Sequence, residues 1–409
     1  MNILLGLNTF DVGGAENFVF RLAKALSESG HKVYLFALYD WNIADAKKRI
    51  EKILGKEYSK VKIVTRWKPG RIKNVILWRL NGLFLRFGKK DYRENIINNS
   101  QIKRLNTFLK KEKIDIVNTH LFEVDEFFSV NFNIPHVISM HGAYEDYLFV
   151  KEGKISGEIN NDFLELSKKV LNKSKNVIYV ADKNLEIFNQ VKLENINTRK
   201  IYIGYDTSDE EKYNKRDSGE YFVFGMIARG IESKGWEIAI NAFEALQKKH
   251  QKIKLILAYT ETEFMKELEN KYKSISGIEF KGFEPVQKNF FESIHALVFP
   301  TWIDCVPNSI IESLFYNIPV ISTETGEIPG MIVNDDKEAG TIIKLDENTH
   351  KPKVEELFNA MEQYLLNNEL YETHKRNTFF VKEKFSMDIC MRKYIDFYIK
   401  AISKGSGVI

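Results

Sequence analysis

Short apolar runs alternate with longer amphipathic stretches along most of the 409-residue chain. In the first half, the apolar run at 2–7 precedes an expected helix over about 16–29. Further strand-like runs read HKVYLFAL, DIVNTH, HVISMH and NVIYVA. Short apolar strands separated by helices predict a parallel, doubly wound sheet. Such sheets bind ligands just beyond the C-terminal ends of their strands.

The second half repeats this alternation. Helices expected over 235–248 and 262–273 lie among the runs YFVFGMIA, KIKLILAYT, GIEFKG, HALVFPT, NIPVIST and AGTIIKL. A polar stretch over 208–220 lacks apolar periodicity and reads as a linker. We therefore expect an N-terminal domain over 1–207, a C-terminal domain over 208–385, and a final helix within 386–409. That helix can pack on either domain, and the N-terminal domain is the favoured partner.

Composition excludes several classes of protein. Hydrophobic residues make up 44% and charged residues 28%, which is typical of globular domains. No apolar run approaches the roughly 18 residues of a membrane span. The start, MNILLGLNTF, lacks the basic region of a secretion signal. The only two cysteines, Cys305 and Cys390, exclude a disulfide scaffold and a cysteine zinc site, and the eight histidines are dispersed.

The first candidate site is the segment DVGGAE at 11–16, between the first strand and its helix. Gly13 and Gly14 let the backbone approach a ligand closely, and a helix N-terminus favours an anion. The segment is not a GxGxxG dinucleotide fingerprint. A tight turn without a ligand is the alternative interpretation.

The second candidate site is the segment ARGIESKG at 228–235, where a strand of the second half ends. Arg229 offers a planar guanidinium and Lys234 a compact charge, a combination that suits a diphosphate. The alternative is two solvated charges on a loop.

The third candidate site is the segment FPTWIDCVPNSIIE at 299–312, in which Asp304 and Glu312 are eight positions apart. A helix that begins at Asn308 would present backbone amides to an anion, with Glu312 one turn inside. A carboxylate there can bridge two vicinal hydroxyls, as on ribose. The alternative is that Asp304 caps the helix and Glu312 is an ordinary surface acid.

In this order and spacing, GGAE, R-x4-K-G and acid-x7-Glu resemble the retaining glycosyltransferases of family 4, which have the GT-B fold. The resemblance covers nearly the whole chain. The segment YIGYD at 202–206 stands where the family usually has Asn-Gly-x-Asp, with Ile203 replacing the asparagine. The segment TGEIP at 325–329 matches the family's glycine-rich turn near the donor sugar. The resemblance implies an α/β protein with two Rossmann-like domains facing a central cleft.

The resemblance implies roles for the glycines and cations of the donor site. Gly13 and Gly14 would lie against the diphosphate of a nucleoside-diphosphate-sugar, with a UDP-sugar as the favoured donor. Arg229 and Lys234 would clamp that diphosphate and stabilise the negative charge of the leaving nucleotide. Preorganised cations of this kind are the largest electrostatic contribution available to such a site.

The resemblance assigns the remaining donor contacts to the segment at 299–312. The amides of Asn308 and Ser309 would touch phosphate, Glu312 would accept the ribose hydroxyls, and Asp304 would face hydroxyls of the sugar. Asp304 departs from the family, which usually has glutamate there. Pro307 replaces a common glycine and removes one amide donor.

Histidines complete the implied site. His120, at the end of DIVNTH, corresponds to the histidine that the family places beside the reacting sugar. His141, at the end of the next strand, is a secondary candidate, and we group it with Glu16 on the acceptor side. The departing phosphate can take the acceptor's proton on the same face. The resemblance therefore implies retention without a carboxylate pair, a metal or another cofactor.

The segment 66–90 contains eight basic residues and no acid. Because the formal net charge is +4, the rest of the chain sums to −4. Its helical pattern from Lys73 predicts a basic amphipathic helix of the kind that lies on membranes. The alternative is a helix packed on the first sheet whose arginines line an acceptor cleft. The residues of this membrane or anionic-acceptor patch are Arg71, Lys73, Trp78, Arg79, Arg86 and Lys90.

Together these patterns predict a glycosyltransferase for a bacterial surface glycan, with a glycan or polyprenyl-linked acceptor. We expect it in the cytoplasm, peripherally at the inner face of the cell membrane. A nucleotide-sugar epimerase of the same fold and a non-catalytic glycan-assembly subunit are the alternatives. Nucleic-acid binding is not expected, because no recognisable module accompanies the basic segment.

Overall fold

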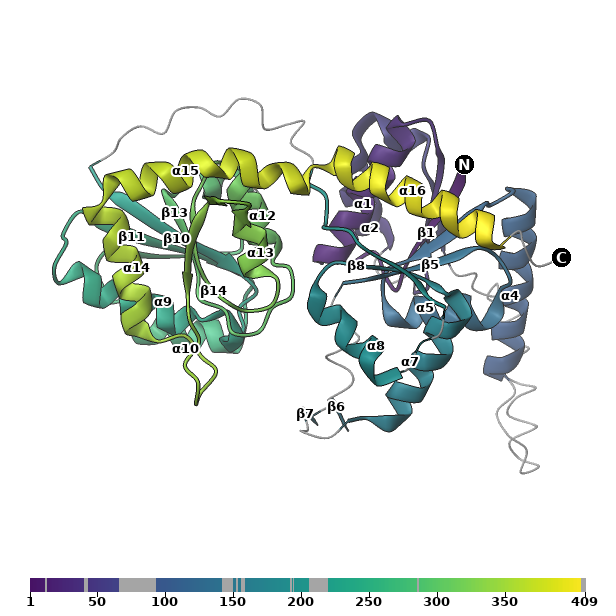
Figure 1. The fold of residues 1–409 in the computed structure, drawn as a ribbon, viewed down its shortest axis with the longest axis horizontal. Coiled ribbons are helices and arrows are strands. Elements are labelled where there is room, and N and C mark those ends of the chain that lie inside the picture. The colour runs from purple at the N-terminus through teal and green to yellow at the C-terminus, as the bar shows by residue number, and fades with distance from the viewer. Residues whose placement is uncertain are drawn as a thin grey trace. The chain divides into compact units, whose positions relative to one another are not determined.

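A computed structural model gives the fold as two compact units (Figure 1). Unit 1 comprises Met1–Val180, Asn184–Ile201 and Cys390–Ile409, and unit 2 comprises Ala181–Lys183 and Tyr202–Ile389. Within these bounds the structure describes residues 1–11, 13–39, 43–65, 93–141, 150–151, 154–155, 159–191, 193, 195–205, 220–284 and 287–405. The expected linker at 208–220 and the basic segment at 66–90 lie almost wholly or wholly outside these ranges.

Unit 1 contains a seven-stranded sheet in the order β3-β2-β1-β4-β5-β8-β9, and every neighbouring pair is parallel. Its strands are β1 (Asn2–Leu7), β2 (Lys32–Ala37), β3 (Lys62–Thr65), β4 (Ile116–Thr119), β5 (His136–Met140), β8 (Asn176–Tyr179) and β9 (Asn197–Lys200). Its helices include α1 (Gly14–Glu28), α2 (Ile43–Leu54), α4 (Arg93–Lys111), α5 (Phe122–Asn131), α7 (Asn161–Ser174) and α8 (Glu186–Val191). The short strands β6 (Val150–Lys151) and β7 (Lys154–Ile155) pair in an antiparallel arrangement.

Unit 2 contains a six-stranded parallel sheet in the order β12-β11-β10-β13-β14-β17. Its strands are β10 (Phe222–Ala228), β11 (Ile253–Tyr259), β12 (Ile278–Gly282), β13 (Ala296–Phe299), β14 (Val320–Thr323) and β17 (Gly340–Ile343). Its helices are α9 (Trp236–Gln247), α10 (Glu263–Tyr272), α11 (Gln287–Ser293), α12 (Asn308–Phe315), α13 (Ile328–Ile332), α14 (Val354–Leu366) and α15 (Asn368–Lys382). Figure 1 shows α15 running beside α12, with which it packs. A short hairpin pairs β15 (Val333–Asn334) with β16 (Lys337–Glu338).

The predicted fold class, two Rossmann-like parallel sheets, is confirmed. Strands such as β1 and β13 are almost continuously buried, because helices cover both faces of a parallel sheet. The helix expected over 262–273 appears as α10, with the Thr262 side chain accepting a hydrogen bond from the Met265 amide as its N-cap. The first helix begins two residues earlier than expected, at Gly14.

The last helix, α16 (Met387–Gly405), packs on unit 1 from Cys390 onward. Its buried Tyr398 hydroxyl donates to Asn118 Oδ1 at 2.6 Å, and Asn118 Nδ2 donates to Ser139 Oγ at 2.9 Å. The Tyr394 hydroxyl, also buried, lies 3.4 Å from the same Ser139 Oγ. A polar network therefore joins α16 to β4 and β5, the two strands that precede the candidate histidines.

Candidate functional site

The candidate residues follow the strands at which each sheet reverses its order. In unit 1 the order reverses between β1 and β4, and in unit 2 between β10 and β13. The loops beyond such paired strands diverge and leave a crevice, where doubly wound sheets bind ligands. Gly13 and His120 follow the two strands of unit 1, whereas Arg229 and Asp304 follow the two strands of unit 2.

Lys234 is a buried cation in the loop that follows β10. It is 4% exposed, and its ammonium donates to Asp304 Oδ2 at 2.6 Å and to the Ile303 carbonyl at 3.1 Å. The other Asp304 oxygen accepts from the Cys305 amide at 2.8 Å. An ammonium has three N–H donors, so two of the three are satisfied by these contacts. The alternative interpretation of Lys234 as a solvated loop charge is therefore wrong.

Two glycines make this arrangement sterically possible. Gly235 has φ +84°, and a Cβ atom there would lie 2.1 Å from the Pro300 carbonyl oxygen. Gly326 has φ +56°, and a Cβ atom there would lie 2.4 Å from the Asp304 carbonyl oxygen. Both positions combine a left-handed backbone with direct contact to the loop after β13. The Thr301 hydroxyl adds a hydrogen bond to the Ser233 carbonyl at 2.9 Å.

Helix α12 begins at Asn308, as the sequence predicts, with Pro307 as its N-cap residue and no capping side chain. Asp304 is therefore not the cap of this helix. Glu312 is 4% exposed and is not a surface acid, which overturns the alternative interpretation. The Ser309 hydroxyl donates to the Ile227 carbonyl at 2.8 Å and fastens the helix start to β10.

Arg229 is an exposed residue at the end of β10. Its carbonyl accepts from the Trp236 indole at 3.1 Å, which fixes the turn that leads to Lys234. Among the described residues its guanidinium makes no hydrogen bond or ion pair that would compete with a ligand. The structure thus places one exposed and one buried cation in the same loop.

Glu327 is a buried carboxylate for which the sequence predicted no individual role. Its Oε1 accepts from the Tyr202 hydroxyl at 2.6 Å, and its Oε2 accepts from the Asp182 amide at 3.3 Å. The first of these bonds joins the segment TGEIP at 325–329 to the segment YIGYD at 202–206. The resemblance placed the first segment near the donor sugar, but only the tertiary structure pairs the two segments.

The glycine turn of unit 1 is occupied by a carboxylate. Gly13 is the N-cap of α1, and a Cβ atom there would lie 2.0 Å from Glu16 Oε2. Burial raises the pKa of Glu16 above its ordinary value, and the nearby Asp11 charge adds to this effect. The exposed Gly14 opens the helix. Arg49 of α2 donates to the carbonyls of Phe10 and Asp11 and holds the chain just before the turn.

His120 and His141 form a hydrogen-bonded pair in unit 1. His120 follows β4, His141 follows β5, and His120 Nδ1 lies 3.0 Å from His141 Nε2. Burial holds the pKa of His120 well below its ordinary value, and that of His141 falls to about 4 for the same reason. Both rings are therefore neutral at pH 7. The edge of the buried Phe18 ring packs against His120, with 6.1 Å between centroids.

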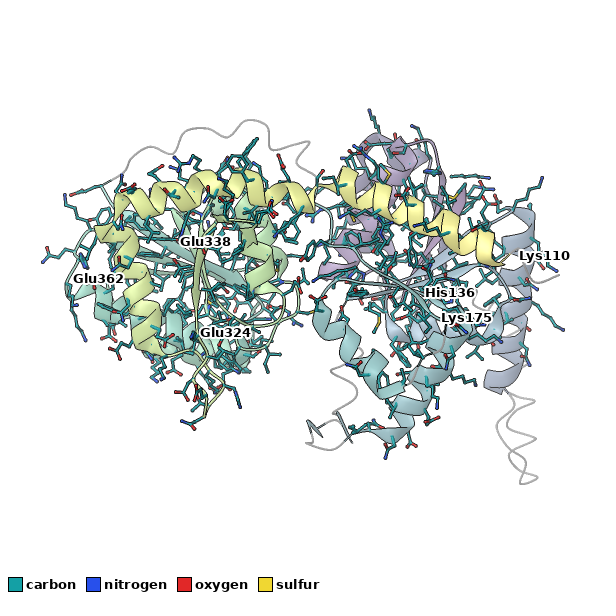
Figure 2. The ribbon with its side chains drawn as sticks, viewed as in Figure 1. Lys110, His136, Lys175, Glu324, Glu338 and Glu362 are labelled. Carbon is teal, nitrogen blue, oxygen red and sulfur yellow. The ribbon has the colours of Figure 1, made fainter. Side chains whose placement is uncertain are left out.

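His136 provides a contrast within the same sheet (Figure 2). Its two ring nitrogens lie 2.7 Å from Thr119 Oγ1 and 3.3 Å from Ser129 Oγ. Burial lowers the pKa of His136 to about 3. With both nitrogens paired to hydroxyls, His136 is a structural residue, whereas the outer nitrogens of the His120–His141 pair have no partner among the described residues.

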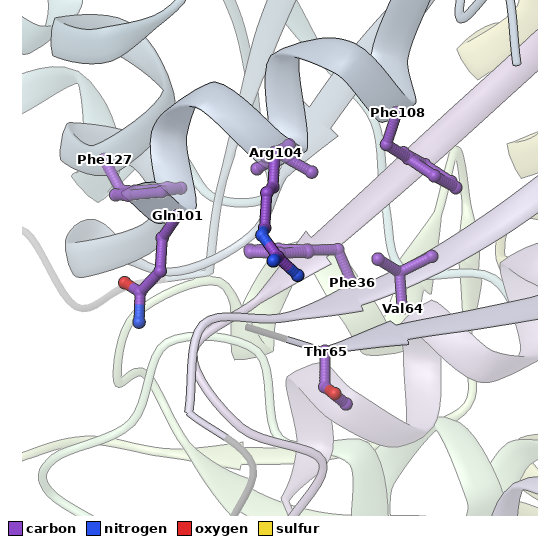
Figure 3. Close-up of a pocket in the computed structure, with 8 residues that line it drawn as sticks. Phe36, Val64, Thr65, Gln101, Arg104, Phe108 and Phe127 are labelled. Atoms are coloured by element: carbon purple, nitrogen blue, oxygen red, sulfur yellow. The ribbon is translucent and has the colours of Figure 1, made fainter. Parts of the chain in front are cut away.

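Unit 1 also contains an apolar cavity of about 200 Å³ (Figure 3). Phe36, Val64 and Thr65 line it from the sheet, and Figure 3 shows Arg104 and Phe108 reaching toward them from α4. Gln101, Leu105 and Phe127 complete the lining. The cavity is thus apolar along most of its wall, with one cation and two polar side chains.

Two further features of the described residues concern metals and membranes. Within these ranges no three His, Cys, Asp or Glu side chains come together in a way that could hold a metal ion. None of the helices described is long and apolar enough to cross a bilayer. The membrane or anionic-acceptor patch, from Arg71 to Lys90, lies outside the described residues.

Two Rossmann-like parallel sheets in one chain are the arrangement of the GT-B fold. The profile of Glycosyltransferase Family 4 matches residues 12–209, and that of Glycosyl transferases group 1 matches residues 207–379. The chain belongs to glycosyltransferase family 4, whose members are retaining enzymes. The resemblance read from the sequence is confirmed.

Individual relatives are distant. The uncharacterized glycosyltransferase MJ1059 of Methanocaldococcus jannaschii is 31% identical over 117 residues, which are 28% of this chain and 29% of that protein. The match thus spans less than a third of that relative's length. HepE of Anabaena, solved in complex with UDP, has a TM-score of 0.71 at 15% identity, with 97% of this chain and 99% of that chain covered. A glycosyltransferase of Rickettsia africae has a TM-score of 0.70 at 16% identity and 98% coverage of both chains.

Proposed function

We propose that this glycosyltransferase takes its sugar from a UDP-sugar and transfers it to a glycan or lipid-linked acceptor in surface polysaccharide synthesis of a bacterium. The observation that carries the donor proposal is the loop of Arg229 and Lys234 at the strand reversal of unit 2. The similar HepE of Anabaena has been solved with UDP and with UDP-glucose, which favours uridine as the base.

The proposed donor contacts follow the charges in this loop. Lys234 keeps its bonds to Asp304 and Ile303 and offers its third N–H to the diphosphate. Arg229, exposed at the strand end, supplies the second cation. Negative charge on the departing UDP then grows against two cations already in place, so the transition state gains more than the ground state.

The proposed sugar and ribose contacts use the other residues of unit 2. Glu312 receives the ribose hydroxyls, the amides of Asn308 and Ser309 contact phosphate, and Asp304 meets a sugar hydroxyl. Asp304 Oδ2 is hydrogen-bonded to Lys234. A sugar hydroxyl bound to Asp304 would therefore be connected, through this bond, to the lysine that contacts the diphosphate. In unit 1, Gly13 and Gly14 contribute the glycine turn.

The acceptor end of the reaction is proposed for unit 1. His120 contacts the reacting sugar, and the departing phosphate takes the acceptor's proton, so the reaction needs no metal. The cavity lined by Phe36, Leu105 and Phe108 fits one ring or a short aliphatic segment, and Arg104 suits a phosphate attached to it. We assign this cavity to the first part of the chain of a lipid-phosphate acceptor, and the enzyme to the cytoplasmic face of the membrane.

The donor proposal is tested with the full chain and a panel of UDP-, GDP- and ADP-sugars. A ligand that binds only the folded protein raises the unfolding temperature, so a UDP-sugar should raise it more than the other bases. Transfer with that sugar should release UDP and persist in EDTA. If a GDP- or ADP-sugar raised the unfolding temperature more, the assignment of uridine as the donor base would be wrong. Loss of transfer in EDTA would contradict the proposal that the reaction needs no metal.

The acceptor proposal is tested by filling the cavity. Leu105→Trp should abolish binding of a short-chain isoprenyl phosphate while leaving UDP binding unchanged, because Leu105 is not among the proposed donor contacts. Lys110→Gln, on the same helix outside the cavity lining, is the matched control. Equal binding of the probe to all three proteins would refute the lipid assignment without affecting the donor assignment.

A further inference from the structure

The paired histidines of unit 1 leave two nitrogens without a partner. His120 is completely buried, and its Nε2 and the Nδ1 of His141 are buried polar atoms that accept or donate no hydrogen bond within the described residues. Buried nitrogens of this kind are rare in folded proteins unless a ligand or water meets them. The inner nitrogens, His120 Nδ1 and His141 Nε2, share one hydrogen bond of 3.0 Å.

Counting protons limits what this pair can present. Each neutral imidazole carries one N–H and one bare nitrogen. One N–H is used between the rings, so one N–H and one lone pair face outward, at opposite ends of the pair. Either His141 donates and His120 presents Nε2–H, or His120 donates and presents a bare Nε2.

We propose that His141 is a positioning residue that donates Nε2–H to His120 Nδ1 and thereby fixes His120 as an Nε2–H donor. This inference rests on the proposed function, in which His120 contacts the reacting sugar. In this arrangement both rings have the Nε2–H tautomer, which is the more stable form of neutral histidine in water. The reverse arrangement would require the less stable Nδ1–H form in both rings.

The packing around the pair fixes the positions of the two rings. The ring planes of His120 and His141 differ by 24°, with 5.3 Å between centroids. Phe18 packs on both rings, at 6.1 Å and 5.5 Å, and Tyr394 of α16 lies 5.9 Å from Phe18. The His120 amide also donates to the Gly6 carbonyl at 3.1 Å, which extends the β1–β4 ladder and fixes the backbone.

The consequence is a defined chemical role for His120. A neutral ring with Nε2–H directed outward donates a hydrogen bond to a sugar oxygen and has no free lone pair with which to accept a proton. His120 would thus orient and polarise the sugar and would not act as the general base. Neutral histidines held as donors in this way are an established means of stabilising charge that develops on oxygen.

Two substitutions at position 141 separate this role from simple packing. In His141→Gln the amide NH₂ takes the place of Nε2–H and can still donate to His120. In His141→Glu the carboxylate accepts from His120 Nδ1–H and leaves Nε2 bare. We expect turnover near that of the parent for His141→Gln and a loss of about 10–100-fold for His141→Glu, by analogy with the loss of the partner that orients a metal-binding histidine. UDP binding should be unchanged in both.

The direct measurement is the ¹⁵N spectrum of histidine-labelled full-length protein without substrate. His120 should show protonated Nε2 and bare Nδ1 in the parent and in His141→Gln, and the reverse pattern in His141→Glu. His136→Gln is the control, because it removes a buried histidine whose partners are hydroxyls. A parent spectrum with His120 protonated at Nδ1, or equal turnover of the two variants, would overturn the inference. Because the spectrum needs no substrate, it tests the tautomer of His120 even if no UDP-sugar is transferred.

Discussion

The two units share the order of their central strands, but the loops that bear their candidate histidines and lysine differ in chemistry. In unit 2 the loops after β10 and β13 contain charged groups, with Lys234 bound to Asp304 at 2.6 Å and Arg229 exposed nearby. In unit 1 the loops after β4 and β5 contain two histidines that burial keeps neutral. Topology therefore selects where a ligand binds, and the loop residues select what kind of ligand.

Under the proposed function, this difference divides one reaction between two similar sheets. A departing nucleoside diphosphate is an anion and needs fixed cations, a role that we propose for unit 2. Sugar hydroxyls are neutral and need oriented hydrogen-bond donors and acceptors, a role that we propose for the neutral histidine rings of unit 1. On this division, substitutions in unit 2 should alter both UDP binding and transfer, whereas substitutions in unit 1 should alter transfer and leave UDP binding unchanged.

The largest effect is expected for Lys234→Ala. Loss of a preorganised cation at the leaving group should lower kcat/KM by about 10²–10³-fold, or roughly 3–4 kcal/mol. UDP binding, measured by calorimetry, should weaken as well. Lys249→Ala is the matched control, because Lys249 also pairs with a carboxylate, Glu362, but on the exposed surface.

That substitution also leaves Asp304 without its partner, so stability must be measured beside activity. The double variant Lys234→Ala/Asp304→Asn removes both charges and should restore stability without restoring transfer. Transfer by the double variant at the level of the parent would break the comparison, since it would mean that unit 2 does not act through its cation. Nearly normal turnover of Lys234→Ala alone would lead to the same conclusion.

The next largest effect is acid destabilisation of unit 1. The pKa of His141 is about 4 in the folded protein and about 6.5 in an unfolded chain, so the unfolded chain binds more protons between these values. The contribution of the neutral His141 ring to stability is therefore fully present above pH 6.5 and is lost as the pH falls toward 4. The loss from His141 alone is on the order of 3 kcal/mol. His120 and His136, whose pKa values are also lowered, act in the same direction.

Hydrogen exchange followed by mass spectrometry can assign this loss to a unit. Between pH 7.5 and 4.5, peptides of β4 and β5 should lose protection before those of β10 and β13. Unit 2 contains a buried histidine of its own, His374, whose pKa is lowered by burial, so it provides the internal comparison. In His141→Gln the acid sensitivity of unit 1 should decrease. Equal loss in both units would remove the electrostatic contrast between them.

The sequence predicted the elements and their order more fully than the partnerships within the site. The run at 2–7 coincides with β1, and the start of α12 at Asn308 was expected, because alternation and turn chemistry are local signals. The His120–His141 bond was not predicted, since it depends on strand pairing between β4 and β5. The contact of Glu327 with Tyr202 joins positions 125 residues apart, and no local pattern encodes such a contact.

A moderate effect is expected for Gly326→Ala, which tests how tightly the unit 2 crevice is built. The added Cβ would meet the Asp304 carbonyl oxygen at 2.4 Å, and the alanine would have to adopt a left-handed backbone conformation. We expect a loss of stability of about 1–3 kcal/mol and a weaker UDP complex, because the loop containing Asp304 must shift. Gly30→Ala in unit 1 is the matched control, with φ +83° and nothing within 4 Å of the new Cβ. If both variants lose equal stability and bind UDP equally, backbone strain alone explains the effect.

The smallest effect is expected for Tyr398→Phe, which tests how α16 supports the neutral crevice of unit 1. The change removes the 2.6 Å hydrogen bond to Asn118 Oδ1 and leaves that buried oxygen without its donor, at a cost of about 1–3 kcal/mol in unfolding by urea. Tyr394→Phe should cost less, since its hydroxyl lies 3.4 Å from Ser139 Oγ. UDP binding should be unchanged in both variants, because neither residue belongs to the nucleotide crevice. A change in UDP affinity without a change in stability would mean that α16 acts on unit 2, and the division of roles between the two sheets would have to be redrawn.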